Sequence, residues 1–512
     1  MWKPLALGVL AAGLGSAQPS VDFRHGDLKV AQNRRFLVHA DGTPFFYLGD
    51  TAWELFHRLN REETERYLEN RRQKRFTVIQ AVVLAELDGL NTPNAAGDRP
   101  FKDNDPAKPN EAYFRHVDWV VDRAREKGLF IGMLPTWGDK VVKASWGVGP
   151  LVFNPENARA YGRFLGRRYR DHVNLIWILG GDRNPNGFEA IWRAMAEGLR
   201  EGDGGRHLMT YHPSGRRSSS EWFHAEPWLD LNMMQSGHNE RDGANYEMIA
   251  RDYQLALVKP TFDGEPRYEN HPVDWKPKEK GWFDEYDVRQ AAYWGVFAGG
   301  HGHTYGCHDI WQMLAPGREP VGFARGTWYG SLDLPGASQM RHLRALMESR
   351  PFLSRVPDRS FLDGEPGRAP DHVEATRGNG YAFVYLPTGR PVTVKLSLHT
   401  PATGTVVAWW YDPRTGFATR IGRFVNEGVN SFRPPRRSER GNDWVLVLDE
   451  GTRGYPPPGM PRTAAPGAST YGSGHGGVEG ASNVWRNCGY GSAVTDVSRR
   501  KSCRSFAVIG AR

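Results

Sequence analysis

The chain has 512 residues, of which 24% are charged and 12% aromatic, and its formal net charge at neutral pH is +8. This length exceeds what one compact core usually holds, so we expect a large domain and a smaller one. Residues 452–512 contain eight Lys or Arg and two Asp or Glu, so +6 of the net charge lies there and only +2 before it. A nucleic-acid-binding protein would concentrate basic residues on its folded body, and the composition therefore argues against that class.

The N-terminus carries the pattern of a secretory signal. Met1-Trp2-Lys3 precedes an apolar stretch over residues 5–14 and the small residues Gly15-Ser16-Ala17. We predict a signal peptide over residues 1–17, cleaved after Ala17, and a soluble secreted protein, extracellular or periplasmic; an ordinary buried segment is the alternative. No later stretch approaches the ~20 apolar residues of a membrane span, so we predict none. The three cysteines, Cys307, Cys488 and Cys503, form neither a disulfide framework nor a zinc signature, and a pairing of the last two stays open.

Strand and helix patterns then alternate along most of the chain. The predicted strands are Pro44–Leu48, Thr77–Leu84, Phe130–Pro135, Leu175–Leu179, Leu208–Tyr211, Leu231–Gln235, Pro260–Asp263 and His303–Gly306. The predicted helices between and after them are Glu62–Lys74, Ala112–Lys127, Pro155–Arg170, Phe188–Arg200, Tyr246–Leu257, Asp284–Ala298 and Ala337–Glu348. Eight such units predict an α/β fold, a (β/α)8 TIM barrel over residues 30–352 with an irregular fifth unit. A doubly wound open sheet is the rival, but no Gly-rich phosphate loop follows the first strand.

The pattern changes near Phe361 to short alternating apolar runs at 380–386, 392–396, 406–411 and 444–448, separated by turn residues. This spacing predicts a small antiparallel β-sandwich domain over residues 355–450. Residues 451–512 are rich in Gly, Ser and Arg with few apolar residues, and we predict a disordered tail there.

Two acidic residues close strand-like runs on opposite sides of the predicted barrel. Asp182 follows the fourth strand in Gly180-Gly181-Asp182-Arg183-Asn184, and Glu265 follows the seventh in Asp263-Gly264-Glu265-Pro266. Barrel enzymes place their chemistry at the carboxyl ends of the strands, and hydrolysis of a glycosidic bond needs two carboxyl groups facing one cleft. We predict Glu265 as nucleophile and Asp182 as general acid/base, ~5 to 5.5 Å apart in a retaining enzyme. A helix cap and a solvated loop residue are the structural alternatives.

The other strand ends offer side chains of the kinds that hold sugars by ring stacking and hydrogen bonding. The predicted substrate-binding residues are Asp50, Trp53, Glu86, Trp137, His212, Gln235, His238, Asp263 and His303. Asp263 and Glu265 are two residues apart and are expected on the same side of a strand, which makes Asp263 the reserve nucleophile. Core packing is the alternative for the tryptophans, and a cap or turn is the alternative for Asp50.

Two further clusters bear on ligands. His301, His303 and His308 have spacings that can converge on one ion, but no other ligand signature accompanies them, so we predict no metal and no organic cofactor. Arg183 and Arg267 each stand beside a catalytic candidate. They would favour an acidic glycan if they line the cleft, or form structural ion pairs if they do not.

The sequence resembles the apiosidase-like glycoside hydrolases, glycoside hydrolase family 140, over roughly Phe36 to Leu448. The resemblance rests on residues 46–57 (FYLGDTAWELFH), on residues 180–184 (GGDRN) and on residues 263–266 (DGEP). It implies a (β/α)8 barrel followed by a β-sandwich of a type labelled collagen-binding. It also implies that Asp182 and Glu265 are the catalytic pair, and that the activity is release of D-apiose from rhamnogalacturonan II side chains in pectin.

The expected partner is therefore a polysaccharide or oligosaccharide of the plant cell wall. Two alternatives stay open. A non-catalytic carbohydrate- or matrix-binding barrel would use the aromatic strand ends equally well, but it has no need of two opposed carboxyl groups, one with a raised pKa. A glycosidase for another furanoside or a uronic-acid-linked sugar would differ only in its pocket.

Overall fold

The computed structural model describes residues 18–397 and 404–462. The predicted signal peptide, residues 463–512 of the predicted tail, Cys488 and Cys503 lie outside the described residues. Within the described part, none of the helices is long and apolar enough to cross a membrane.

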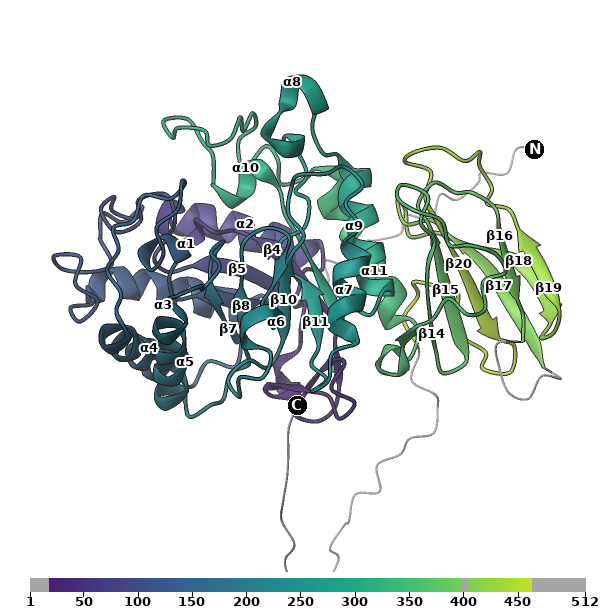
Figure 1. Cartoon of the computed structure of the whole chain (residues 1–512), viewed down its shortest axis with the longest axis horizontal. Coiled ribbons are helices and arrows are strands. Elements are labelled where there is room, and N and C mark those ends of the chain that lie inside the picture. Colours follow the sequence, from purple (N-terminus) through teal and green to yellow (C-terminus); the bar gives the residue numbers. More distant parts are fainter. Residues whose placement is uncertain (1–17, 398–403, 463–512) are drawn as a thin grey trace, which may run out of the picture. The chain divides into compact units, whose positions relative to one another are not determined.

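Eight parallel strands form the centre of the larger domain (Figure 1). They are β4 (Tyr47–Thr51), β5 (Val78–Val82), β6 (Phe130–Leu134), β7 (Leu175–Gly180), β8 (Met209–His212), β10 (Asn232–Gln235), β11 (Thr261–Asp263) and β12 (Gly302–Tyr305). Their order is β8-β7-β6-β5-β4-β12-β11-β10, and the short β9 (Arg217–Ser218) adds to β10 in antiparallel fashion. The backbone N–H of Asp230 donates to the carbonyl of Met209 at 2.8 Å, which bridges the remaining gap between β8 and β10. The sheet is a nearly closed barrel, and the predicted fold class is confirmed.

The first predicted strand needs correction. Pro44 and Phe45 form β3 (Pro44–Phe45), which pairs with β2 (Leu37–His39) and through it with β1 (Leu28–Val30) in a separate antiparallel sheet. The barrel strand β4 begins at Tyr47, and Gly49 pairs with Val78 of β5. Asp50 therefore lies inside the strand and not after it, because a buried strand continues as long as its backbone has a partner on each side.

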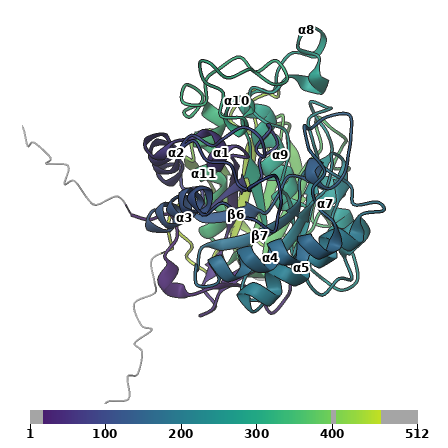
Figure 2. The same cartoon turned by 90° about the vertical axis from the view of Figure 1, so that its left-hand side faces the viewer.

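Helices cover the outside of the barrel, and Figures 1 and 2 show α4 and α5 side by side against β7. The long helices are α2 (Arg61–Gln73), α3 (Glu111–Glu126), α4 (Pro155–Tyr169), α5 (Glu189–Asp203), α7 (Asn245–Tyr253), α9 (Glu285–Phe297) and α11 (Pro335–Glu348). Each lies within a few residues of its predicted range. The start of α4 shows why: the side chain of Asn154 accepts from the backbone N–H of Asn157 at 3.0 Å, and Pro155 occupies the first helical position.

Several one-turn helices escaped the sequence analysis because four residues show no periodicity. They are α1 (Leu55–Arg58), α6 (Ser220–Phe223), α8 (Pro277–Lys280) and α10 (His308–Trp311), with the 3₁₀ turns η1 (Phe23–His25), η2 (Gly138–Lys140), η3 (Val273–Trp275) and η4 (Phe352–Ser354). The unit after β8 is irregular, as predicted, since only β9 and α6 follow that strand.

The C-terminal domain consists of antiparallel sheets around their own apolar core. One sheet has the order β13 (Val356–Pro357), β14 (Glu374–Gly378), β15 (Tyr381–Leu386), β20 (Trp444–Glu450), β17 (Thr405–Tyr411) and β18 (Ala418–Val425). A second sheet pairs β16 (Val392–Lys395) with β19 (Val429–Phe432). Val384, Val394 and Leu446 belong to the core that the two sheets share. The antiparallel architecture is confirmed, while the half-exposed β18 and β19 lacked the apolar alternation that revealed the others.

A buried seam joins the two domains along α9. Tyr293 stacks on Tyr385 of β15 with ring centroids 5.0 Å apart. The guanidinium of Arg289 donates to both carboxylate oxygens of Asp443, at 3.0 and 2.6 Å. Because side chains of both domains enter one continuous hydrophobic cluster, the barrel and the sandwich form one compact unit up to Arg462.

Candidate active site

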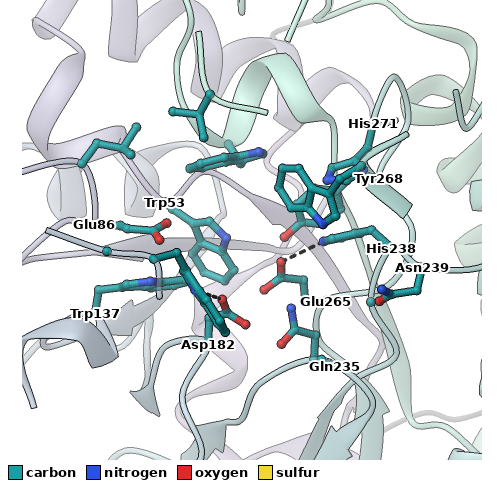
Figure 3. Close-up of a pocket in the computed structure, with 18 of the residues that line it drawn as sticks. Trp53, Glu86, Trp137, Asp182, Gln235, His238, Asn239, Glu265, Tyr268 and His271 are labelled. Carbon is teal, nitrogen blue, oxygen red and sulfur yellow. Dashed lines mark hydrogen bonds and ion pairs between the residues drawn. The ribbon is translucent and has the colours of Figure 1, made fainter. Parts of the chain in front are cut away.

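A cavity of about 530 Å³ opens at the carboxyl ends of the barrel strands. Its apolar walls are mainly aromatic and come from Trp53, Trp137, Trp146, Tyr268, Trp275 and Trp311. Its polar lining comes from Glu86, Asp182, Gln235, His238, Asn239, Glu265 and His271. Figure 3 shows the carboxyl groups of Asp182 and Glu265 directed into this one cavity, with Trp53 beside them. An enclosed aromatic pocket with few polar groups is typical of a small-ligand site.

The backbone at the end of β7 turns sharply to present Asp182. Gly180, Gly181 and Asp182 all have positive φ values, of 86°, 113° and 53°. A side chain at Gly180 would place its Cβ 2.3 Å from the carbonyl oxygen of His212, so only glycine fits this approach. The backbone N–H of Asp182 donates to Nδ1 of His212 at 3.0 Å, and the indole N–H of Trp146 donates to its carboxylate Oδ2 at 2.7 Å.

Glu265 stands two residues beyond β11 and is buried between two histidines. Nε2 of His212 lies 2.7 Å from its Oε2, and Nε2 of His238 lies within hydrogen-bond distance, 3.1 Å, of its Oε1. His212 accepts a hydrogen bond from the Asp182 backbone at Nδ1, so its own ring proton is on Nε2, the nitrogen that lies 2.7 Å from Glu265. One imidazole thus ties the two acidic residues together.

The two carboxyl groups have opposite pKa shifts. Burial, and then the charge of Glu265, raises the pKa of Asp182 to about 6, and His212 and Arg183 only partly oppose this. Burial acts on Glu265 in the same direction, but the imidazoles of His212 and His238 outweigh it and lower the pKa of Glu265 to about 2. Between about pH 2 and pH 6 the pair therefore holds one proton, on Asp182, beside an ionised Glu265, as an acid and a nucleophile require.

A third carboxyl group, Glu86, faces the same cavity. Burial, and then the charges of Asp182 and Asp139, raises the pKa of Glu86 to about 8. At neutral pH Glu86 is thus protonated and presents both a donor and an acceptor to a ligand. When Asp182 is also protonated, the cavity therefore holds one full negative charge, on Glu265.

Most of the predicted site residues meet at the cavity. Trp53, Glu86, Trp137, Gln235 and His238 line it together with Asp182 and Glu265. His212 is fully buried beneath the acidic pair. The tryptophans form one wall, since the rings of Trp53 and Trp137 are 5.2 Å apart.

Besides His212, which is buried below the cavity, three predicted residues do not reach it. Alternate residues of a strand face opposite sides, and Tyr47 points into the barrel, where its hydroxyl donates to Gln80, so Asp50 points outward. Its carboxylate pairs with Nε of Arg71 at 2.6 Å and accepts from the Tyr67 hydroxyl, both on α2. His303 lies opposite Leu48 and Asp263 in the sheet, on the same outer face.

Asp263 likewise points outward, to the side of α7. Its carboxylate accepts from Ser236 Oγ at 2.6 Å and from Asn245 Nδ2 at 3.1 Å. The expectation that Asp263 and Glu265 share one side is wrong because β11 ends at Asp263 and period-two alternation stops there. Asp263 does not face the cavity and is therefore not a candidate nucleophile.

Other cavity residues escaped the sequence analysis because they lie deep in loops. Tyr268 and His271 follow Glu265 by three and six residues, and Trp146 and Trp275 lie in the loops that follow β6 and β11. The α8 and α10 segments next to Trp275 and Trp311 lie beyond the upper end of the barrel in Figures 1 and 2. Searching each whole loop for aromatic residues would have found them.

Neither arginine beside the acidic pair faces the cavity. Arg183 is buried and donates to the carbonyl oxygens of Val142, Trp146 and Asp182, at 3.3, 2.5 and 2.8 Å. Arg267 is buried and donates to Gln290 Oε1 at 2.9 Å. Within the described residues, the cavity therefore has no cationic lining. Among residues 18–397 and 404–462 no cluster of three or more His, Cys, Asp or Glu side chains is arranged to hold a metal ion.

Comparison with known proteins identifies the class that this fold and cavity define. The family described as "Apiosidase-like, catalytic domain" matches residues 31–354, and a collagen-binding-like domain described for a collagenase matches residues 356–449. The chain belongs to the apiosidase-like family and is a glycoside hydrolase by fold and relationship.

Solved structures agree with this assignment. One described as "Glycoside hydrolase" is 37% identical, with a TM-score of 0.79, and the match covers 85% of this chain and 99% of that one. Another, a glycoside hydrolase family 5 protein from Bacteroides vulgatus, is 35% identical with a TM-score of 0.79, over 85% of this chain and 95% of that one. No curated protein sequence matches the chain.

Proposed function

We propose that this protein is a retaining glycoside hydrolase in which Glu265 is the nucleophile and Asp182 the general acid/base. The observation that carries the proposal is the opposite pKa shift of two carboxyl groups facing one cavity: burial raises the pKa of Asp182, whereas His212 and His238 lower that of Glu265. A binding protein gains nothing from such an arrangement, since a protonated and an ionised carboxyl side by side serve proton transfer and attack.

The first step transfers the Asp182 proton to the glycosidic oxygen while Glu265 attacks the anomeric carbon. The bond to the leaving group breaks with its electron pair staying on the protonated oxygen, and a glycosyl ester forms on Glu265. In the second step the ionised Asp182 takes a proton from water, which attacks the same carbon and releases Glu265 as carboxylate. The raised pKa suits Asp182 to both steps, and the histidines keep Glu265 ionised between turnovers.

We further propose that the substrate is a plant cell-wall polysaccharide and that the released sugar is apiose from rhamnogalacturonan II side chains in pectin. The family match supports this choice. The aromatic walls of the cavity also suit the apolar face of a sugar ring, and its volume of about 530 Å³ is large enough for a terminal sugar and part of the next residue. Within the described residues, no Lys or Arg lines the cavity, which favours a neutral terminal sugar over a uronic acid.

Secretion completes the proposal. A pectin-degrading enzyme must meet its polymer outside the cytoplasm, and residues 1–17 have the composition of a signal peptide. Expression with these residues, followed by N-terminal sequencing of the exported protein, tests this part. A mature N-terminus at Gln18 supports it, and an uncleaved chain retained in the cytoplasm contradicts it.

The activity is tested by incubating the purified protein with pectic rhamnogalacturonan II and analysing released sugars by chromatography, beside the Glu265→Ala and Asp182→Ala variants. We expect apiose, or an apiose-terminated fragment, from the parent and its loss in both variants. Early products followed by NMR should retain the anomeric configuration. If the parent cuts neither this nor any other cell-wall glycan, the protein is a carbohydrate-binding barrel instead.

A further inference from the structure

The loop between η2 and α4, residues 141–154, is held in place from inside the barrel mouth. The buried Arg183 donates to the carbonyl oxygens of Val142 and Trp146 in this loop, at 3.3 and 2.5 Å. Asp139 Oδ2 accepts from the backbone N–H of Gly149 at 2.9 Å, while its Oδ1 lies 2.8 Å from Nζ of Lys140. Two buried charged side chains thus fix the loop at three points.

The loop leaves one aromatic ring exposed at the cavity rim. Trp146 is 47% exposed, whereas Trp53 and Trp137 of the inner wall are each 2% exposed. The guanidinium carbon of Arg183 lies 4.5 Å from the centre of the Trp146 ring, so the cation covers part of the indole from within. Gly147 has a φ of 90°, and a Cβ there would lie 2.6 Å from Cβ of Asp139, so the chain needs glycine to hold this position. A large aromatic ring that is exposed at the rim of a cavity suits stacking against a ligand.

The position of this ring relative to Asp182 indicates which part of a ligand it meets. The indole N–H donates to Oδ2 of Asp182 at 2.7 Å. A general acid must lie within hydrogen-bond distance of the oxygen that it protonates, and that oxygen belongs to the departing part of the glycan. The departing part therefore begins within a few ångströms of the indole, at the exposed rim of the cavity, whereas Trp53 and Trp137 form its inner wall.

We propose that Trp146 forms the subsite for the leaving group, on which the sugar ring next to the cleaved bond stacks, and that Arg183 is the positioning residue that holds this subsite. This inference rests on the proposed function. The occupant is a neutral sugar ring that presents an apolar face of C–H groups, since the exposed Val148 beside Trp146 is also apolar. Arg183 accordingly affects substrate binding by positioning the loop, and it does not pair with an anionic glycan.

The test compares two substrates that release the same sugar. One is the rhamnogalacturonan II side chain, and the other is the glycosyl fluoride of the released sugar, whose leaving group needs neither a sugar subsite nor an acid. For Trp146→Ala we expect kcat/KM on the glycan to fall at least tenfold and kcat/KM on the fluoride to change less than threefold. Leu151→Ala, an exposed apolar residue of the same loop outside the cavity lining, is the matched control and should affect neither.

Two further variants separate stacking from the hydrogen bond to Asp182. Trp146→Phe keeps an aromatic face but loses the N–H that lowers the pKa of Asp182. It should keep KM for the glycan within about threefold of the parent while the alkaline limb of the pH profile moves upward. Arg183→Lys loses the hydrogen bonds that the guanidinium donates to two carbonyl oxygens of the loop. This variant should raise KM for the glycan and leave kcat/KM for the fluoride unchanged.

Binding of the product provides a readout independent of chemistry. The oligosaccharide that remains after digestion by the parent, purified by chromatography, should inhibit the parent at least tenfold more strongly than Trp146→Ala. Equal loss on both substrates in a folded Trp146→Ala protein, or equal inhibition by this product, would overturn the subsite. If the parent cleaves neither substrate, the proposed function itself fails, and the subsite falls with it.

Discussion

The cavity at the barrel mouth and the seam between the barrel and the sandwich both bury carboxylates, but different groups contact these carboxylates in the two places. At the seam, Arg289 donates to both oxygens of Asp443, and Arg350 donates to both oxygens of Asp449 at 2.8 and 2.7 Å. At the mouth, the indole of Trp146 donates to Asp182, whose carboxylate lies 3.7 Å from a single nitrogen of Arg183, and two imidazoles contact Glu265.

The difference shows how the surroundings assign a role to a buried charge. An arginine that donates to both oxygens satisfies the carboxylate with two charge-assisted hydrogen bonds, which suits a structural joint. A carboxyl group that has a neutral donor and a neighbouring negative charge keeps a pKa near the working pH and can exchange its proton. The seam residues should therefore govern stability and the mouth residues activity.

The largest effect is expected for the acidic pair at the mouth. Glu265→Gln should lower kcat by roughly 10⁴-fold or more because the attacking oxygen is lost, and Asp182→Asn should lower it by roughly 10² to 10⁴-fold. Release of sugar from rhamnogalacturonan II measures both. Retained activity in Glu265→Gln would assign the nucleophile elsewhere.

Asp182→Asn also tests the contrast by its effect on stability. The pKa of Asp182 is raised in the folded protein, so folding favours its protonated form. Its contribution to the free energy of unfolding is therefore complete below pH 4 and is lost as pH rises through about 6. Asparagine does not ionise, so the variant should melt at a higher temperature than the parent at pH 7, and the gap should close toward pH 4. A variant less stable than the parent at pH 7 would contradict this account.

The second largest effect is expected at the seam. Asp443→Ala leaves the buried Arg289 guanidinium unpaired and should lower the free energy of unfolding by about 3 to 5 kcal/mol, measured with denaturant. Its kcat/KM should stay within about twofold of the parent under folding conditions. Asp122→Ala is the control, because Asp122 forms an exposed ion pair with Arg125 and should cost less than about 1 kcal/mol.

The pH dependence of the parent provides a smaller, graded effect. The first step needs Asp182 protonated, so kcat/KM should fall above pH 6 by about tenfold per pH unit. It needs Glu265 ionised, and the acid limb should therefore lie near pH 2. Initial rates from pH 3 to 9 should show the alkaline limb and no acid limb above about pH 3. An alkaline limb near pH 4 would show that Asp182 has an ordinary pKa.

The smallest effect is expected for His238→Gln. Loss of one of the two imidazoles that lower the pKa of Glu265 should move the acid limb upward and reduce kcat/KM severalfold at pH 4. At pH 6 the reduction should be less. A uniform reduction at both pH values would indicate that His238 acts on substrate binding and not on Glu265.

The eight strands and seven long helices follow from the sequence because each carries a local periodic signal of apolar residues, caps or turns. The acidic pair was equally predictable, since Asp182 and Glu265 each follow closely on an apolar, strand-like run. Asp50, Asp263 and His303 were misplaced because their side of the strand depends on where the strand begins and ends, which one or two residues decide.

The sequence by itself determined the class of fold, the antiparallel second domain and the two acidic residues, because these depend on interactions between near neighbours in the chain. Only the tertiary structure decided that His212 links the pair, that Arg183 turns into the loop of Trp146 and that Asp443 meets Arg289 across 154 residues. Such contacts depend on how elements far apart in the chain pack, and packing sets burial, which in turn sets the proton affinities of the site.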